Sequence, residues 1–368
     1  MKGRHRFWRL VRRIFLLALL AFGIGLLLAS QAQPDFRPIV EPLSPEKKAL
    51  IARTPHYGRP EDATYLSFPE WYLVFNPQEY ARVLHDSSPS AFPFFRSIGQ
   101  FWYGYAQVYG IARRWYPFDF GQHLTVMVIG CSTTVEYTIK GLYEGSVGRL
   151  SEWAASGHRT PEDDYAAKVA REYGEFIPTE PWFEFPFGHA LTGLWSGTAF
   201  FGPQFIRKIE RKLFLSLEYG TKTIYAGLIR LASRAVYGAA DTRVYATVRS
   251  VPDRALTDPE VKKIQELSDG SWLITVPHYQ GFTDTVPRLA DLGVEFEEIA
   301  GNDEILLTLV APSAWSFDLA SGKELFSMRM LASPGLKRVA VQAPVKSLSS
   351  TLRQIKAEHL QLEHLYDY

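Results

Sequence analysis

The chain is poor in cysteine, carries almost no net charge and lacks the common catalytic motifs. Cys131 is its only cysteine, which excludes an intrachain disulfide and a thiolate metal cluster. The formal net charge is +1, and beyond the first 13 residues 34 bases stand against 39 acids. This balance gives no reason to expect nucleic acid as a partner.

Motifs that identify catalytic serines, zinc sites and phosphate-binding loops are also missing. The nine histidines include no pair at metal-ligand spacing on one predicted helix. His359 and His364, which flank Glu363, would point to opposite faces of a C-terminal strand. The sequence therefore predicts neither a metal site nor a cofactor.

A long apolar run, residues 14–33, follows six basic residues at the N-terminus. About 20 helical residues span a bilayer core of roughly 30 Å, and a basic flank stays in the cytoplasm. We therefore expect residues 1–33 to form a cytoplasmic tail and a single-pass transmembrane anchor in a bacterial inner membrane. The bulk of the chain would lie in the periplasm, with the lipid bilayer as a partner.

Two alternatives to the anchor remain open. Ser30-Gln31-Ala32 provides a cleavage site for a signal peptide, but the apolar core is longer than such peptides usually have. Arg12 and Arg13 also resemble a twin-arginine export signal, which would imply a protein folded around a cofactor before export. The leucine-rich core favours the anchor.

Composition divides the rest of the chain into three parts. Residues 34–61 are rich in proline and predict an extended stalk with one short helix. Residues 62–240 predict an aromatic-rich helical domain, with helices over 92–116, 123–153, 160–177 and 204–237. Residues 241–368 change to short alternating runs, which predict strands over 243–249, 271–278, 294–300, 304–311, 324–331 and 338–343.

Two stretches of the last part share one pattern at a separation of 66 residues. Residues 273–299 and 339–365 agree in the positions of their apolar side chains, and each predicts strand, helix, strand. Two such units form a ferredoxin-like α/β sandwich, here with an inserted hairpin over 304–331. The expected fold class is α+β: a transmembrane helix, a mainly helical middle domain and a ferredoxin-like C-terminal domain.

Residues 185–206 contain no formally charged side chain and precede four closely spaced bases. Their glycines and prolines make a poor transmembrane span, because freed backbone groups need partners that lipid does not offer. We expect a buried or interfacial segment. A second crossing would instead place residues 241–368 in the cytoplasm.

The candidate catalytic residues are Glu136, Lys140 and Glu70. Glu136, Lys140 and Glu144 are four apart, so on a helix they would share one face and act as general acid and base. The same spacing is typical of a stabilising ladder of ion pairs, which remains the alternative.

Two short segments combine proline, tryptophan and glutamate. Glu70 precedes Trp71 and Tyr72, and Trp182 precedes Glu184, each group just after a proline. The three aromatic side chains and Glu184 are candidate ligand-binding residues, because together they would line a cleft closed by a carboxylate. Two ordinary helix starts with inward-packed aromatics would show the same pattern.

These patterns suggest two functions. The first is a binding or assembly role for a membrane-anchored envelope protein, with a protein partner or through self-association. The second is a membrane-proximal enzyme in which Glu136 or Glu70 carries a proton for a small apolar or lipid-derived substrate. The sequence leaves the choice open.

Overall fold

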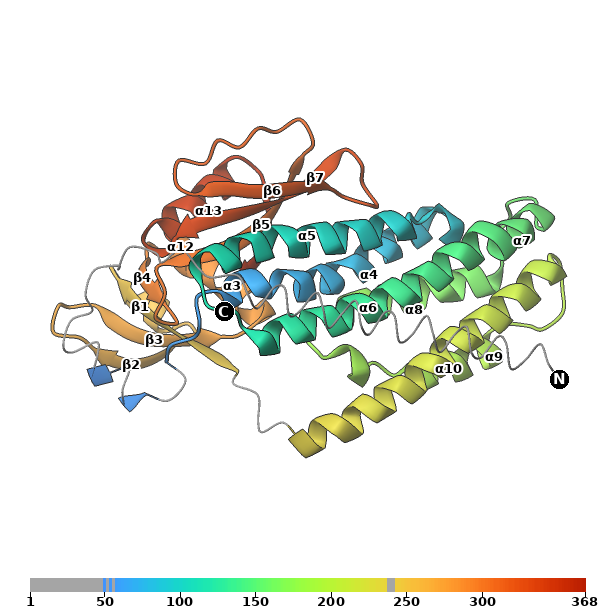
Figure 1. The fold of residues 1–368 in the computed structure, drawn as a ribbon, viewed down its shortest axis with the longest axis horizontal. Coiled ribbons are helices and arrows are strands. Elements are labelled where there is room, and N and C mark those ends of the chain that lie inside the picture. Colours follow the sequence, from blue (N-terminus) through green and yellow to red (C-terminus); the bar gives the residue numbers. More distant parts are fainter. Residues whose placement is uncertain (1–48, 51–52, 55–56, 237–241) are drawn as a thin grey trace.

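The computed structural model describes residues 49–50, 53–54, 57–236 and 242–368. The predicted membrane anchor and most of the predicted stalk lie outside the described residues. The chain has an α+β fold in which an elongated helical bundle lies beside two β-sheets (Figure 1). Among the described residues, no helix is long and apolar enough to cross a membrane.

The first part of the described chain is helical, as predicted. Its longer helices are α4 (Phe68–Asp86), α5 (Phe94–Trp115), α6 (Phe120–Tyr143), α8 (Pro161–Phe176), α9 (Phe187–Gly197) and α10 (Phe205–Val236). Its shorter segments are α3 (Ala63–Leu66), η1 (Pro89–Ala91), the π-helical η2 (Glu144–Gly148), α7 (Arg149–Ala154) and η3 (Trp182–Glu184). Although residues 125–139 are rich in β-branched side chains, α6, η2 and α7 follow one another without a break.

The second part contains the strands. They are β1 (Arg243–Arg249), β2 (Lys262–Glu266), β3 (Trp272–Pro277), β4 (Glu295–Ile299), β5 (Glu304–Pro312), β6 (Lys323–Arg329), β7 (Leu336–Pro344) and β8 (Gln361–Tyr366). The helical segments between them are α11 (Asp253–Leu256), α12 (Gln280–Asp291), η4 (Val345–Ser347) and α13 (Leu348–Ala357). The strands form two antiparallel four-stranded sheets with the orders β2-β3-β1-β4 and β6-β7-β5-β8.

The two sheets repeat one topology, in which three strands are followed by a helix and a fourth strand. The predicted strand-helix-strand units are therefore confirmed, as β3-α12-β4 and β7-α13-β8. The repeat includes an irregularity: the register shifts between Thr247 and Val248 in β1, and between Thr308 and Leu309 in β5.

The predicted ferredoxin-like arrangement of all these strands in one sheet is wrong. In the first sheet β1 lies between the two strands of its unit, β3 and β4. In the second sheet β5 lies between β7 and β8, so each unit belongs to a separate sheet. The predicted hairpin over 304–331 is also wrong, because β5 pairs with β7 and β8, while β6 pairs with β7.

Both sheets turn one face towards a shared core. Ile305, Leu307 and Leu309 of β5 join this core together with side chains from β1, β3, β7, α12 and α13. Leu306 points to the opposite face, as alternation along a strand requires, and packs with Tyr65 and Phe68 of the helical part. The second sheet is therefore covered by the helical bundle on its other face.

The residues just before α3 are fixed to the first sheet. Tyr57 is 2% exposed, donates a hydrogen bond to Glu298 at 2.8 Å and stacks on Tyr245. Arg59 donates to the backbone oxygen of Tyr368 at 2.7 Å. The end of the predicted stalk thus packs on the folded part.

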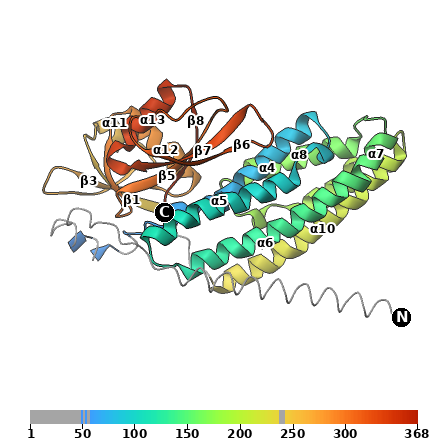
Figure 2. The same ribbon diagram turned by 45° about the horizontal axis from the view of Figure 1, so that its top comes forward.

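Within the bundle, α6 and α10 lie side by side along one side, and α4 and α8 lie on the other (Figure 2). Helices α6 and α10 run antiparallel. Tyr143 at the end of α6 stacks on Phe214, whereas Lys140, earlier on α6, contacts Glu218, which lies further along α10. Helix α5 crosses α6 closely at Gly130, where an added Cβ would lie 2.3 Å from the Phe101 ring.

Candidate functional site

Glu70 lies in the first turn of α4 and is held by α6. Its carboxylate accepts a hydrogen bond from Gln122 Nε2 at 2.6 Å. Burial raises the pKa of Glu70, and the bond from Gln122 offsets only part of this rise.

Trp71 and Tyr72 are core side chains. Trp71 is 8% exposed and its ring lies against the ring of His364 from β8. Tyr72 is buried and donates a hydrogen bond to the backbone oxygen of Ser97 at 3.1 Å. Both pack between the helices and the second sheet.

Trp182 and Glu184 lie in η3, beside the last turns of α10. The Trp182 ring packs against Tyr225 with a centroid distance of 5.3 Å. The half-exposed Glu184 carboxylate lies 3.8 Å from the Arg230 guanidinium. Both residues therefore contact α10 rather than α4.

Glu136 and Lys140 belong to a cluster of four alternating charges between α6 and α10. Lys140 Nζ lies 3.1 Å from Glu136 and 2.6 Å from Glu218. Lys222 Nζ lies 3.1 Å from Glu136 and 3.3 Å from Glu218. Each carboxylate thus contacts both ammonium groups.

This cluster fixes the charge state of its members. Burial would raise the pKa of Glu136, but the ammonium groups of Lys222 and Lys140 outweigh it and hold the pKa at about 2. Burial would lower the pKa of Lys140, yet Glu218 and Glu136 raise it well above its ordinary value. A general acid or base works best with a pKa near the working pH, and neither group has one.

The structure does not bring the predicted site residues together. Glu136 lies 14 residues beyond Gln122 on α6, about 21 Å along the helix at roughly 1.5 Å per residue, so it is far from Glu70. Glu184 has a separate partner in Arg230. A cavity of about 450 Å³ between α4, α8, α12 and the second sheet is lined by none of the predicted residues.

Metal ligands do not gather in the described part of the chain either. Among the described residues, no group of three histidine, cysteine, aspartate or glutamate side chains is arranged to hold a metal ion.

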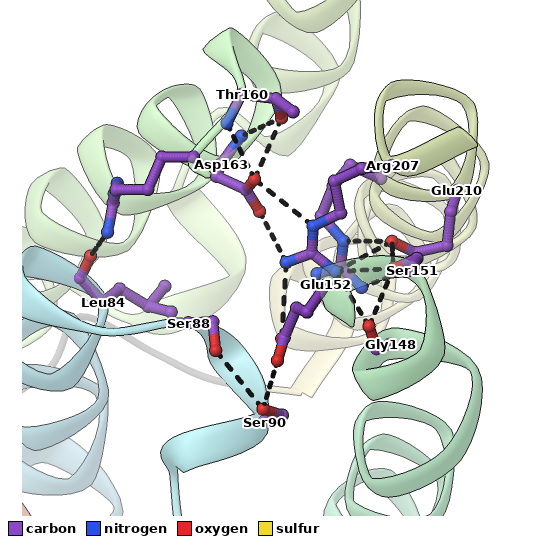
Figure 3. A network of polar contacts seen from close by, with 12 residues as sticks. Leu84, Ser88, Ser90, Gly148, Ser151, Glu152, Thr160, Asp163, Arg207 and Glu210 are labelled. Atoms are coloured by element: carbon purple, nitrogen blue, oxygen red, sulfur yellow. Dashed lines mark hydrogen bonds and ion pairs between the residues drawn. The ribbon is translucent and has the colours of Figure 1, made fainter. Parts of the chain in front are cut away.

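A larger ion network, which sequence reasoning missed, lies where α10 begins (Figure 3). Arg207 is 2% exposed, and its guanidinium lies 2.7 Å from Asp163 and 3.1 Å from Glu210. It also donates to Ser151 at 2.8 Å. Asp163 in turn closes the capping box of α8 with Thr160. One arginine thus joins α7, α8 and α10.

Arg211, one turn further along α10, extends the network to the π-helical segment. Its guanidinium donates to both oxygens of Glu144, at 3.0 and 3.1 Å, and to Glu210 at 2.5 and 2.8 Å. Arg211 and Glu144 are each 1% exposed. Gly148 leaves room for this carboxylate, because an added Cβ would lie 2.3 Å from Glu144 Oε2.

Two lysines of the same helix turn flank another buried carboxylate. Lys208 Nζ and Lys212 Nζ each lie 3.6 Å from Glu162 of α8. Lys212 also donates to the backbone oxygen of Thr198 at 2.9 Å. The four bases that follow the uncharged run 185–206 are therefore paired inside the bundle.

Among the residues whose side chains the structure describes, few charges reach the outward sides of α6, α9 and α10. The described aspartate, glutamate, lysine and arginine side chains of these helices are all buried or half-buried. The large apolar side chains exposed along α6, η2 and α7 are Phe120, Val128, Val135, Ile139, Leu142, Val147, Leu150 and Trp153. Those exposed from α9 to α10 are Trp195, Phe200, Phe201, Phe205, Ile206, Leu213, Leu217, Ile224, Tyr225, Leu228 and Leu231.

Helix α8 shows the opposite distribution. Its exposed side chains include Asp164, Lys168, Arg171, Glu172 and Glu175. The bundle thus has a charged side that suits water and an apolar side that does not. The sequence carries a signal for this side: the uncharged residues at 124, 128, 131, 135, 139, 142, 146 and 150 are three or four apart and so share one helix face. The spacing does not tell whether that face points inward or outward.

No protein-family model, curated protein or solved structure matches this chain.

Proposed function

We propose that this chain is a membrane-anchored protein of the bacterial envelope with a binding or assembly role. Residues 14–33 would hold it in the inner membrane, with the folded part in the periplasm. The observation that supports the membrane location is the apolar outward side of α6, α9 and α10. Soluble monomers rarely expose a contiguous apolar patch larger than a few hundred Å², and this one follows two helices of 24 and 32 residues.

The buried ion pairs suit such a molecule. Because many apolar side chains of α6 and α10 point outward, hydrophobic burial between these two helices is reduced. Paired charges such as Lys140 with Glu218, and Arg211 with Glu144, fix the register of the two helices instead. We therefore assign Glu136 and Lys140 a structural role.

The acid-base enzyme has less support. Glu136 keeps a pKa of about 2 between two ammonium groups, and Glu70 and Glu184 have separate partners. The binding role therefore has more support than acid-base catalysis.

Reporter fusions test the topology of this proposal. A reporter that is active only in the periplasm should give a signal when it is fused after residue 61 and also when it is fused after residue 368. A cytoplasmic C-terminus with a periplasmic position 61 would indicate a second crossing and contradict the proposal. A cytoplasmic location of the reporter at both positions would show that the folded part is not exported, which would also contradict the proposal.

Affinity capture of the detergent-solubilised full chain tests the binding role. A stoichiometric protein partner, or self-association, supports it. Repeated recovery of a lone monomer from solubilised membranes counts against it.

A further inference from the structure

We infer that the apolar outward side of α6, α9 and α10 lies against the lipid bilayer. This inference rests on the proposed membrane anchor and names the partner of one surface. We call it the lipid-facing surface. It consists of Val128, Cys131, Val135, Ile139 and Leu142 on α6, Trp195 on α9, and Leu213, Leu217, Ile224, Leu228 and Leu231 on α10.

The shape of this surface suits a planar apolar partner. At roughly 1.5 Å per residue, α6 extends about 36 Å and α10 about 48 Å, and the two lie side by side (Figure 2). Ile139 is 59% exposed and Leu217 70% exposed, so these side chains project from the bundle. Helices with one apolar side and one charged side lie along a membrane with the apolar side in the headgroup and acyl boundary.

The charge distribution indicates which side faces water. Lys168 and Glu172 on α8 are 57% and 47% exposed and belong to the opposite, charged side of the bundle. By contrast, Glu136 and Lys140 on α6 turn towards α10 and are paired there. The bundle as a whole is therefore amphipathic.

The ends of the lipid-facing surface carry the residues that membrane interfaces favour. Trp153 is 81% exposed and Phe201 74% exposed at the end where α7 and α10 meet. Arg149 is exposed beside them, and Arg113 and Arg114 are exposed shortly before α6 begins. Aromatic rings are enriched at the headgroup level, and exposed bases are attracted to anionic lipid phosphates.

Lipid suits this surface better than a protein partner. Protein interfaces carry roughly one hydrogen bond per 100–200 Å² and have a polar rim. Among the side chains of α6 and α10 that the structure describes, no charged one is fully exposed. A bilayer requires no such partner groups.

The anchor keeps the bilayer within reach. Residues 34–48 separate the apolar run from the described chain. Fifteen residues span at most about 50 Å, which is comparable to the length of α10. A bundle tethered on this length can therefore lie along the membrane surface.

The single cysteine provides a native probe. Cys131 is exposed on the lipid-facing surface, so a spin label can be attached to the otherwise unaltered full chain. The labelled protein is reconstituted in vesicles of phosphatidylethanolamine and phosphatidylglycerol. We expect oxygen, which concentrates in lipid, to accelerate the relaxation of this label strongly. A water-soluble nickel chelate should accelerate it only weakly.

The matched control carries the label on α8, in the Cys131→Ser/Lys168→Cys variant. We expect the reverse order of oxygen and nickel accessibility there. If the nickel chelate reaches both labels equally while the protein floats with the vesicles, this inference is overturned. The proposed membrane anchor is not contradicted by that result.

Two further outcomes also overturn it. Dipolar broadening at Cys131, or a label shielded from both reagents, would show that protein covers the surface: a second copy or residues 14–33 of the same chain. Full chain that does not float with the vesicles would overturn the proposed anchor, and the inference with it.

Discussion

Removing the Arg211 guanidinium tests whether the buried ion network stabilises the fold. Arg211→Met fills the position with an apolar side chain. It leaves the Glu144 carboxylate, itself 1% exposed, without the guanidinium that contacts both its oxygens. Breaking a buried pair by removing one partner costs about 3–5 kcal/mol, since the remaining charge stays desolvated. We expect Arg211→Met to lower the free energy of unfolding by that amount.

The assay is denaturant unfolding of the purified full chain in detergent micelles, followed by tryptophan fluorescence. Lys168→Met is the matched control, because Lys168 and Glu172 form an exposed pair at 3.8 Å on α8. Its loss should be at most about 0.5 kcal/mol. The double variant Glu144→Gln/Arg211→Met should lose less than the two single losses added, since the unpaired carboxylate is gone. A loss for Arg211→Met no larger than that of the control, or full additivity in the double variant, would refute the reasoning.

Two further predictions concern a buried acid and a helix crossing. Asp62→Asn should stabilise the protein above pH 6, because burial and the neighbouring Asp119 raise the pKa of Asp62 to about 6. The folded state then binds the proton more tightly than the unfolded state, so the parent loses stability as the pH rises from about 4 to about 6. Unfolding free energies of parent and variant should converge near pH 4, and a constant difference would contradict this. Gly130→Ala should cost about 1–3 kcal/mol, because its Cβ would lie 2.3 Å from the Phe101 ring. Gly110→Ala on α5, with open space around it, should stabilise by up to about 1 kcal/mol, and equal effects in the two thermal melts would speak against the close crossing.

Local patterns predicted most helices and strands of the described chain. The 66-residue spacing located β3-α12-β4 and β7-α13-β8, because alternation and helical periodicity are properties of neighbouring residues. Strand β2 was missed, since all five of its residues are exposed and leave no apolar alternation. The division into two sheets was also missed, because it depends on which strand becomes central in each unit.

The candidate site was less predictable, because it depends on contacts between distant residues. Val135 and Ile139 share one helix face by their spacing, but that this face points outward depends on distant contacts of the same helix, such as the pair of Lys140 with Glu218. The spacing favours a ladder of Glu144 with Lys140, yet the Glu144 carboxylate pairs with Arg211, which is 67 residues away. Spacing along one helix cannot reveal such a partner.

Photo-crosslinking of the full chain to lipid tests the central claim most directly. Vesicles containing a phospholipid with a photoreactive acyl chain are irradiated, and the adducts are mapped by peptide mass spectrometry. We predict adducts within residues 120–154 and 205–231, which carry the outward sides of α6 and α10, and none within α8. Adducts confined to residues 14–33, or equally frequent on α8, would contradict the claim that the bundle lies on the bilayer.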